Sequence, residues 1–370
     1  MQPTTMGIED VGAKHQEIVA RLRRSSEAIA DEILKFERRN SAVIRTQMHD
    51  LDEQVRRFFR DFPILTAAQM KARAEGRPEG DEGPGIDAPQ WAALMAEVNQ
   101  TRLAINRWRE IRLIVEAQVE TRQTPLYRPP ADAFDITGAQ LEEVSMLVAR
   151  LTKVLNGVEQ DKDTHAGGAF ADIPLPHADF LAHLHAAYRL RLAQDEKGPS
   201  YFIDVGCGGG MKVFQAGRFF DRALGIELDP GYVSVAERFL GAAGHTNCQA
   251  LAFDALEFPS YGDFHVIYFY RPIRKRELLN KLEAKIAADA RRGAILIAPY
   301  QFFVPVAEAL DCRRVGEAVY VKGYTQDEAE ALVRRAETTG PMIRTPLPPL
   351  MHVWDPILRA SAKRGFGLSI

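Results

Sequence analysis

Hydrophobic residues recur every three to four positions through the first 160 residues, and later residues group into short apolar runs separated by turns. The first pattern predicts amphipathic helices. We expect helices at about 8–36, at 42–60 with an end at Pro63, at 89–121, and at 137–158 with Thr137 as its cap. Residues 71–89 are rich in Gly, Pro and charge, which predicts a flexible segment.

The segment 89–121 has the clearest helical pattern. Its apolar positions alternate in steps of four and three, as in a coiled-coil seam, although Thr101 and Arg112 interrupt that seam. The seam consists of Leu94, Val98, Thr101, Ile105, Trp108, Arg112, Val115 and Val119. We therefore expect residues 1–160 to form a helical bundle or a coiled-coil hairpin, followed by a linker at 161–176.

Strands and helices alternate after the linker. A helix is predicted at 177–194, and the apolar runs predict strands at 201–205, 222–227, 247–253, 264–270, 294–299 and 313–321. Helices are predicted between them at 209–220, 230–242 and 273–290, and after them at 326–337. This order predicts an α/β domain over 177–370 with a Rossmann-like, doubly wound, mainly parallel sheet. We expect the apolar tail to pack onto this domain.

The most informative stretch is SYFIDVGCGGG at residues 200–210, a β-favouring run that ends in a glycine turn before a helix. Dinucleotides use G-x-G-x-x-G, but Met211 stands where the third glycine belongs. Asp204 lies two residues before the first glycine, and an anion there suits an ammonium group better than a pyrophosphate. These residues argue against a dinucleotide-dependent oxidoreductase.

The pattern Asp-x-Gly-x-Gly-Gly-Gly resembles motif I of class I S-adenosylmethionine-dependent methyltransferases. Three further predicted strand ends, near Glu227, Asp254 and Pro272, strengthen this resemblance. It covers about residues 176–323 and implies S-adenosyl-L-methionine as the cofactor. The acceptor is open: a small molecule, a protein or RNA. The helical domain would recognise substrate or mediate homodimerisation.

The resemblance also implies roles for individual residues. The glycines would place backbone against the methionine part of the donor, Asp204 would lie near its ammonium group, and Glu227 would accept both ribose hydroxyls. The implied cofactor-binding residues are Asp204, Gly206, Gly208, Gly210, Glu227, Leu228, Asp254 and Ala255. Leu228 would lie against the adenine. The adenine amino group would donate a hydrogen bond to Asp254, with the N–H of Ala255 nearby.

Candidate catalytic residues come from the fourth strand, which ends in Tyr268-Phe269-Tyr270-Arg271-Pro272. Tyr268 or Tyr270 could hold the sulfonium by a cation–π contact or act on the substrate. Their spacing of two places them on one face of a strand, which core aromatics would also satisfy. The Asn/Asp-Pro-Pro-Tyr/Phe loop of amino-directed methyltransferases is absent here. This absence leaves a second hypothesis, a methyltransferase-like scaffold that acts through partner contacts of its helical domain.

Composition excludes several function classes. The net charge of −3 gives no global field for nucleic acid, and no apolar run approaches the length of a membrane span. The three cysteines are widely spaced, and His177, His183 and His185 lack companions at metal-ligand spacing, so we expect no metal site. Without a signal-peptide pattern, we expect a cytoplasmic protein. The many arginines before residue 61 are expected to form a solvated helix face.

Overall fold

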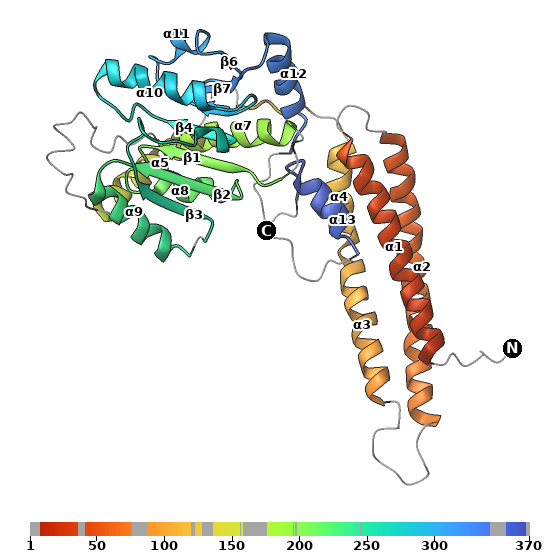
Figure 1. The fold of residues 1–370 in the computed structure, drawn as a ribbon. Helices are drawn as coiled ribbons and strands as arrows, with labels where there is room; N and C mark the ends of the chain where they lie inside the picture. The colour runs from red at the N-terminus through yellow and green to blue at the C-terminus, as the bar shows by residue number, and fades with distance from the viewer. Residues whose placement is uncertain are drawn as a thin grey trace. The chain divides into compact units, whose positions relative to one another are not determined.

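The computed structural model of the chain describes residues 8–35, 41–75, 88–119, 123–127, 136–155, 157, 176–194, 196, 198–244, 246–340 and 353–367. The chain forms two compact units (Figure 1). A helical unit combines Met1–Thr121 with Thr345–Ile370, and a sheet unit comprises Arg122–Arg344.

The sheet unit is built on seven strands in the order β3-β2-β1-β4-β5-β7-β6. They are β1 (Tyr201–Val205), β2 (Arg222–Glu227), β3 (Cys248–Ala252), β4 (Val266–Phe269), β5 (Ile295–Ile297), β6 (Cys312–Arg314) and β7 (Val319–Lys322). The first five strands are parallel to one another, whereas β7 is antiparallel to both β5 and β6. The order 3-2-1-4-5 is shared with dinucleotide-binding sheets, but the antiparallel β7 is not.

Helices cover both faces of this sheet, which confirms the predicted doubly wound α/β fold. They are α5 (Ile136–Leu155), α7 (His177–Ala193), α8 (Met211–Ala216), α9 (Pro230–Ala242), η1 (Tyr261–Asp263), α10 (Arg276–Asp289), α11 (Val304–Ala307) and α12 (Gln326–Ala336). On one face, the ring of Phe180 from α7 contacts Tyr268 of β4 edge-on at 5.0 Å. On the other face, Leu282 of α10 shares a buried core with Ile203 of β1.

Local capping explains where two of these helices begin. Asp229 precedes α9, and its Oδ1 accepts the N–H of Gly231 at 2.8 Å. Thr325 and Glu328 form a reciprocal capping box at the start of α12. The first cap matters for the site, because it fixes the chain direction directly after the end of β2.

The helical unit contains α1 (Ile8–Leu34), α2 (Ser41–Glu75), α3 (Ala88–Asn106), α4 (Trp108–Val119) and α13 (Asp355–Ala362). Trp354, directly before α13, is 0% exposed and stacks on Trp108 with ring centroids 4.9 Å apart. Its Nε1 donates to the carbonyl of Ala104 at 2.7 Å. Arg364 donates to the carbonyl of Ile33 at 3.0 Å. The end of the chain therefore completes the core of the helical unit.

The two units divide the chain differently from the predicted domains at 1–160 and 177–370. Helix α5 belongs to the sheet unit, where the hydroxyl of Ser145 accepts the N–H of Ala178 at 2.8 Å. Buried Arg189 of α7 donates to the carbonyls of Thr124 and Pro125, so the chain joins the sheet unit already at these residues. The tail, expected on the sheet, packs in the helical unit instead.

Three predicted elements differ in detail. Pro63 does not end α2, which runs on to Glu75 and forgoes only the backbone hydrogen bond that the proline nitrogen cannot donate. The helix predicted at 89–121 breaks at Arg107 between α3 and α4. The strand predicted at 313–321 is an antiparallel pair, β6 and β7. Thr137 has no described side chain, and most of 71–89 lies outside the described residues.

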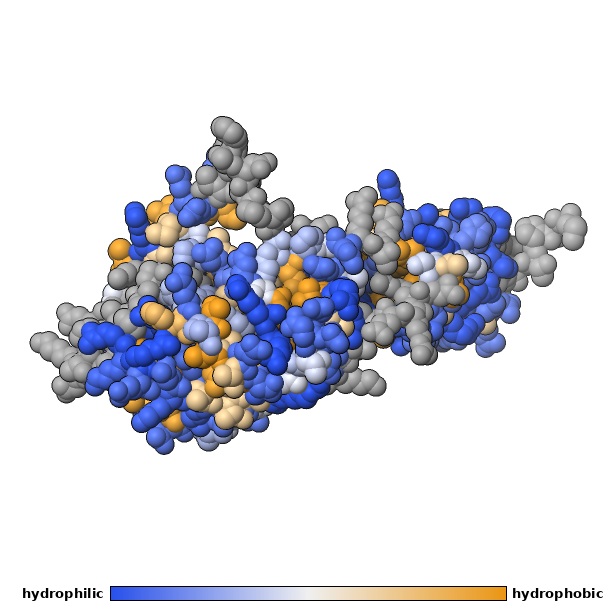
Figure 2. All heavy atoms as spheres, turned by 90° about the horizontal axis from the view of Figure 1, so that it is seen from above, coloured by the Kyte–Doolittle hydropathy of each residue, from blue (hydrophilic) through white to orange (hydrophobic). Residues whose placement is uncertain are grey.

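Several arginines of helices α1 and α2 form ion pairs with acids along the helix surface. Arg23 pairs with Glu27 at 3.1 Å, one turn away, and Arg21 and Arg56 pair in the same way with Glu17 and Glu53. The space-filling view shows mostly hydrophilic colours over this part of the chain (Figure 2). None of the described helices has the length and hydropathy needed to span a membrane.

Candidate functional site

The strand order reverses between β1 and β4, and this reversal defines a topological switch point at the carboxyl edge of the sheet. β1 pairs with β2 on one side and with β4 on the other, so Val205 lies between Ile226 and Phe269. From these ends the chain leaves in opposite directions, which opens space above the sheet edge. Open α/β sheets bind their ligands at such a point.

The predicted glycine turn follows β1 at this point. Gly206 and Gly210 both have φ of +82°, a backbone region that favours glycine. A Cβ on Gly206 would come within 2.8 Å of Cβ of Pro272, and a Cβ on Gly210 within 2.9 Å of Cβ of Ala236. The turn therefore packs between the loop after β4 and helix α9, and both glycines are required by their protein neighbours.

Glu227 links the glycine turn to the end of β2. Its Oε2 accepts the N–H of Gly208 at 3.0 Å, while Oε1 accepts the N–H groups of Leu228 at 2.8 Å and Asp229 at 3.1 Å. Burial raises the pKa of this carboxyl above its ordinary value, although the three hydrogen bonds act in the opposite direction. Because each carboxylate oxygen can accept two hydrogen bonds, Oε2 keeps acceptor capacity for a ligand.

Two carboxylates surround Cys207 inside the turn. Burial raises the pKa of the Cys207 thiol well above its ordinary value, and Asp204 and Glu227 raise it further through their charge, while Lys212 opposes them. Asp204 is only 1% exposed on β1. Because burial and both carboxyls disfavour the thiolate, Cys207 stays a protonated packing residue rather than a nucleophile.

Exposed apolar side chains flank Glu227. Leu228 is 51% exposed and Phe253 is 37% exposed. Phe253 follows β3, and its N–H donates to the carbonyl of Glu227 at 2.9 Å, so the two residues lie side by side. The sequence analysis did not identify Phe253, although its place between β3 and Asp254 was a usable signal.

Asp254 and Ala255 follow Phe253 and take part in local turn structure. Oδ1 of Asp254 accepts the N–H of Leu256 at 2.9 Å, and the carbonyl of Ala255 accepts the hydroxyl of Tyr261 at 2.8 Å. Asp254 is half-buried and keeps a second carboxylate oxygen. The carboxyl ends of β1, β2 and β3 thus bring Asp204, Glu227 and Asp254 to neighbouring positions on one sheet edge.

The two candidate catalytic tyrosines have different surroundings. Tyr268 is 1% exposed, packs against Phe180 of α7, and has the ammonium of Lys212 5.6 Å from its ring centroid. Tyr270 lies past the end of β4 and packs against the core on the other face of the sheet, where α10 lies. The ring centroids of Tyr270 and Tyr300 are 6.4 Å apart. The expectation of a common face is therefore wrong, since strand alternation stops at Phe269.

A basic and aromatic cluster follows Tyr270. Arg271 has φ of +47°, which is uncommon for a residue with a side chain and marks local backbone strain. The guanidinium groups of Arg271 and Arg276 lie 5.1 and 4.8 Å from the ring centroid of Phe302, which is 48% exposed. The sequence shows a basic run, RPIRKRE, directly after Tyr270, but the contact with Phe302 could not be predicted from it.

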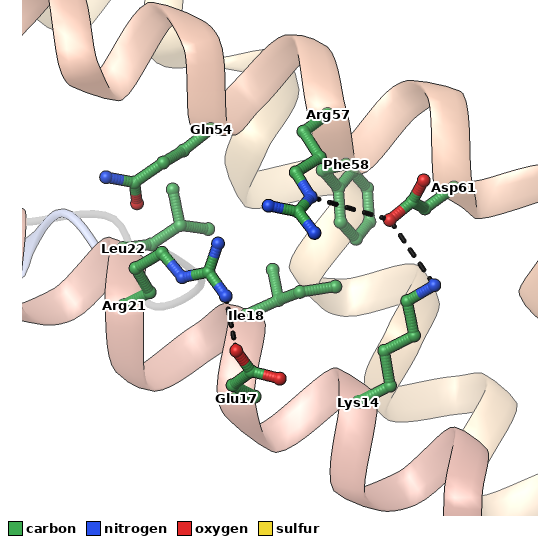
Figure 3. A pocket seen from close by; sticks show the side chains of 9 residues that line it. All are labelled: Lys14, Glu17, Ile18, Arg21, Leu22, Gln54, Arg57, Phe58 and Asp61. Atoms are coloured by element: carbon green, nitrogen blue, oxygen red, sulfur yellow. Dashed lines mark hydrogen bonds and ion pairs between the residues drawn. The ribbon is translucent and has the colours of Figure 1, made fainter.

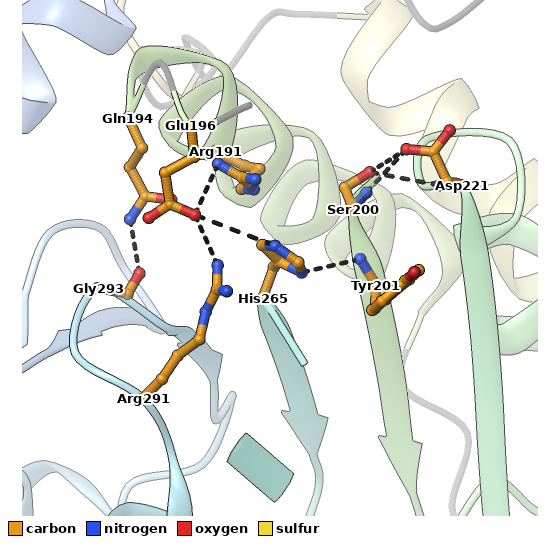
Figure 4. Close-up of polar contacts among 9 residues, drawn as sticks. All are labelled: Arg191, Gln194, Glu196, Ser200, Tyr201, Asp221, His265, Arg291 and Gly293. Atoms are coloured by element: carbon orange, nitrogen blue, oxygen red, sulfur yellow. Dashed lines mark hydrogen bonds and ion pairs between the residues drawn. The ribbon is translucent and has the colours of Figure 1, made fainter. Parts of the chain in front are cut away.

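The opposite, amino edge of the sheet holds a polar network with a structural role (Figure 4). One carboxylate oxygen of Glu196 lies 2.7 Å from Arg291, 3.3 Å from Arg191 and 4.0 Å from Nε2 of His265. Nδ1 of His265 accepts the N–H of Tyr201 at 3.1 Å. Burial, followed by Arg191 and Arg291, lowers the pKa of His265 to about 4, so this side chain is neutral at pH 7.

The histidines of α7 also make structural contacts. Nδ1 of His183 lies 3.2 Å from the hydroxyl of Tyr127, and Nδ1 of His177 lies 3.1 Å from the side-chain nitrogen of Gln215. Among the described residues, no three His, Cys, Asp or Glu side chains gather as metal ligands would.

A small hollow with a volume of about 40 Å³, open to solvent, lies between α1 and α2 of the helical unit (Figure 3). Its charged side chains pair with one another: Lys14 and Arg57 lie 3.3 and 4.0 Å from the same oxygen of Asp61. Arg21 pairs with Glu17 in the same way. Because these cations are already neutralised, we do not assign a ligand to this hollow.

No model of a known protein family matches the chain, and no curated protein matches it in sequence. Solved structures do match part of the chain. An amino pentose methyltransferase from Micromonospora echinaspora is 17% identical with a TM-score of 0.28; the match covers 36% of this chain and 59% of that chain. A sugar N-methyltransferase from Streptoalloteichus is 19% identical with a TM-score of 0.27 and coverages of 36% and 56%.

An RNA methyltransferase from Salinibacter ruber, solved with S-adenosyl-L-homocysteine, is 19% identical with a TM-score of 0.29. That match covers 42% of this chain and 97% of the other. This chain thus spans a little over half of the first two structures and nearly all of the third. With such low identities and TM-scores, we derive the function from the residues of this chain.

Proposed function

We propose that the sheet unit is a class I methyltransferase that binds S-adenosyl-L-methionine at the switch point between β1 and β4. The observation that carries this proposal is the pair of carboxylates, Asp204 and Glu227, beside the glycine turn. Carboxylates at this place would favour a donor with ammonium and sulfonium groups and disfavour the pyrophosphate of a dinucleotide.

The residues at this edge fit the donor part by part. Oε2 of Glu227 has acceptor capacity for ribose hydroxyls, and Asp204 would supply charge for the ammonium group. Leu228 and Phe253 offer exposed apolar surface to the adenine, with Asp254 and Ala255 beside them. The backbone of Gly206, Gly208 and Gly210 would lie along the methionine part.

When bound, the donor supplies a methyl group that its positive sulfur already activates. The task of the chain is then to align an acceptor with that methyl carbon, and alignment alone can lower a barrier by several kcal/mol. Tyr270 and the cluster of Arg271, Arg276 and Phe302 lie beside the turn, because Pro272 contacts Gly206. We place the acceptor on this side and expect it to carry negative charge. Buried Tyr268 fits a packing role better than contact with the acceptor.

Calorimetric titration of the full chain with S-adenosyl-L-methionine, S-adenosyl-L-homocysteine and NAD tests the donor site. We expect micromolar binding of the first two and none of NAD. Glu227→Gln should weaken binding roughly 10- to 100-fold, because the ribose hydroxyls lose a charged acceptor. Glu237→Gln, an exposed acid on α9, is the matched control and should bind as the wild type. Tighter binding of NAD, or unchanged binding by the Glu227 variant, would refute the assignment.

Transfer is tested separately from binding. Incubation with a cell extract and methyl-labelled donor should label an acceptor, which can then be classed by its sensitivity to protease or ribonuclease. A chain that binds the donor but labels nothing would fit the alternative, a methyltransferase-like scaffold acting through partner contacts.

A further inference from the structure

Helix α5 of the sheet unit exposes an unusual amount of apolar surface for a helix in water. Large hydrophobic side chains 39% to 77% exposed occur along nearly its full length. They are Leu141 (51%), Val144 (57%), Met146 (39%), Leu147 (55%), Val148 (39%), Leu151 (50%) and Val154 (77%). Single exposed hydrophobics are common, but a contiguous row of them marks an interaction surface.

The exposed residues form a stripe with helical periodicity. Leu141, Val144, Leu151 and Val154 are separated by three, seven and three positions, and Leu147 fills the gap between them. The other side of α5 faces its own unit: Ser145 is 5% exposed and accepts the N–H of Ala178 in the first turn of α7. The stripe is thus turned away from α7, and its period is that of a seam between two helices.

Charges along one edge of the stripe indicate the partner. Glu143 and Arg150 are exposed and seven residues apart, so they lie on the same side of α5 about two turns from each other. When two antiparallel helices face each other, this edge of one meets the same edge of the other. Glu143 of one copy would then lie opposite Arg150 of the other, twice, because the arrangement is two-fold symmetric.

The apolar positions share the same centre. The midpoint of Glu143 and Arg150 falls between residues 146 and 147, and the midpoint of Leu141 and Leu151 falls at Met146. The two centres differ by half a residue, about 0.75 Å along the helix, so one two-fold axis fits both the charged pair and the pair of Leu141 and Leu151. A membrane surface fits less well, because the acidic Glu143 borders the stripe.

We propose that α5 is a homodimerisation surface in which two copies of the chain pair their α5 helices antiparallel about Met146. The contact is a single helix pair, small compared with a standard protein interface, so we expect a reversible dimer with a dissociation constant on the order of micromolar to tens of micromolar.

Sedimentation velocity of the full chain, from about 1 to 200 µM, measures this equilibrium. Glu143→Arg should weaken the dimer roughly tenfold, because each like-charged arginine then faces Arg150 of the other copy. The double variant Glu143→Arg with Arg150→Glu should restore the dissociation constant to within roughly threefold, since opposite charges face each other again. All these positions are exposed, so the monomer should stay folded.

A second measurement removes the apolar contact. Val144→Glu with Leu151→Glu should weaken association at least about 100-fold without changing donor binding or thermal unfolding of the monomer. A wild type that stays monomeric at about 200 µM, as when another part of the chain covers α5, would overturn the proposal. A dimer unaffected by Val144→Glu with Leu151→Glu, or a charge swap that restores nothing, would overturn it equally.

Discussion

Gly206 and Pro272 touch across the switch point: a Cβ on the glycine would lie 2.8 Å from Cβ of the proline. This contact joins the turn after β1 to the loop after β4, so the proposed donor and acceptor sides of the site are held in register. No sequence pattern shows it, because 65 residues separate the two positions.

Gly206→Ala should therefore disrupt the site more than its size suggests. The new methyl group collides with Pro272, and φ of +82° is strained for alanine, so we expect a loss of about 1 to 3 kcal/mol in the free energy of unfolding. Donor affinity should fall with it, as calorimetry can measure. Gly241→Ala in α9 is the control: no heavy atom lies within 4 Å of its new Cβ, so neither quantity should fall.

His265 should make stability depend on pH. Its folded pKa is about 4, against an ordinary value of 6.5, since burial, Arg191 and Arg291 disfavour the charged form and only Asp221 favours it. Between these values the unfolded chain binds the proton and the folded chain does not. Stability is therefore full above pH 6.5 and falls as the pH drops towards 4, by about 1 to 3 kcal/mol.

Urea unfolding from pH 4 to 7.5 measures this effect against His265→Asn. The asparagine oxygen can still accept the N–H of Tyr201, but the side chain does not titrate. The slope of stability against pH between 4 and 6.5 should be smaller in the variant. Equal slopes would show that other groups dominate in this range.

Tyr300, which follows β5, and Glu283 of α10 form a buried pair. The hydroxyl of Tyr300 donates to Oε1 of Glu283 at 2.7 Å, and Glu283 is 1% exposed. Tyr300→Phe leaves the carboxyl without this donor and should lower the free energy of unfolding by about 1 to 3 kcal/mol. Glu283→Gln keeps an acceptor and removes a buried charge, so it should cost less. A larger loss in the glutamine variant would contradict this account.

Trp354 offers a test of the helical unit alone. All three tryptophans of the chain, Trp91, Trp108 and Trp354, lie in that unit, so their fluorescence reports on its unfolding. Trp354→Leu removes the stacking on Trp108 and the hydrogen bond to Ala104, and should cost about 2 to 4 kcal/mol. Donor binding by the sheet unit should persist. Loss of donor binding without a fluorescence change would contradict the division into two units.

The sequence predicted which strands end beside one another at the switch point, because strand ends can be recognised locally. The apolar runs before Gly206, Glu227 and Asp254 end at turns, and parallel strands bring such ends to one edge. The same reasoning failed beyond Phe269, where β4 stops and alternation no longer orders the side chains. It also gave no contact between Arg271 and Phe302, which depends on how two loops pack.

The sequence predicted where the helices of the first half lie better than it predicted to which structural unit each belongs. Periodicity marks a helix and its apolar face, but not the surface which that face covers. The short tail around Trp354 fits any apolar groove of suitable size, and only tertiary packing selects the core beside Trp108. Likewise, α5 has a helical period, and only its packed side at Ser145 assigns it to the sheet unit.

The helical unit is made from both ends of the described chain, with the whole sheet unit inserted between them. During synthesis, the ribosome therefore releases every strand before Trp354 emerges, and the sheet can assemble first. Helices α1 to α4 would meanwhile expose the groove that α13 later fills. The interval before this last segment arrives is the stage at which the nascent protein most needs protection from aggregation.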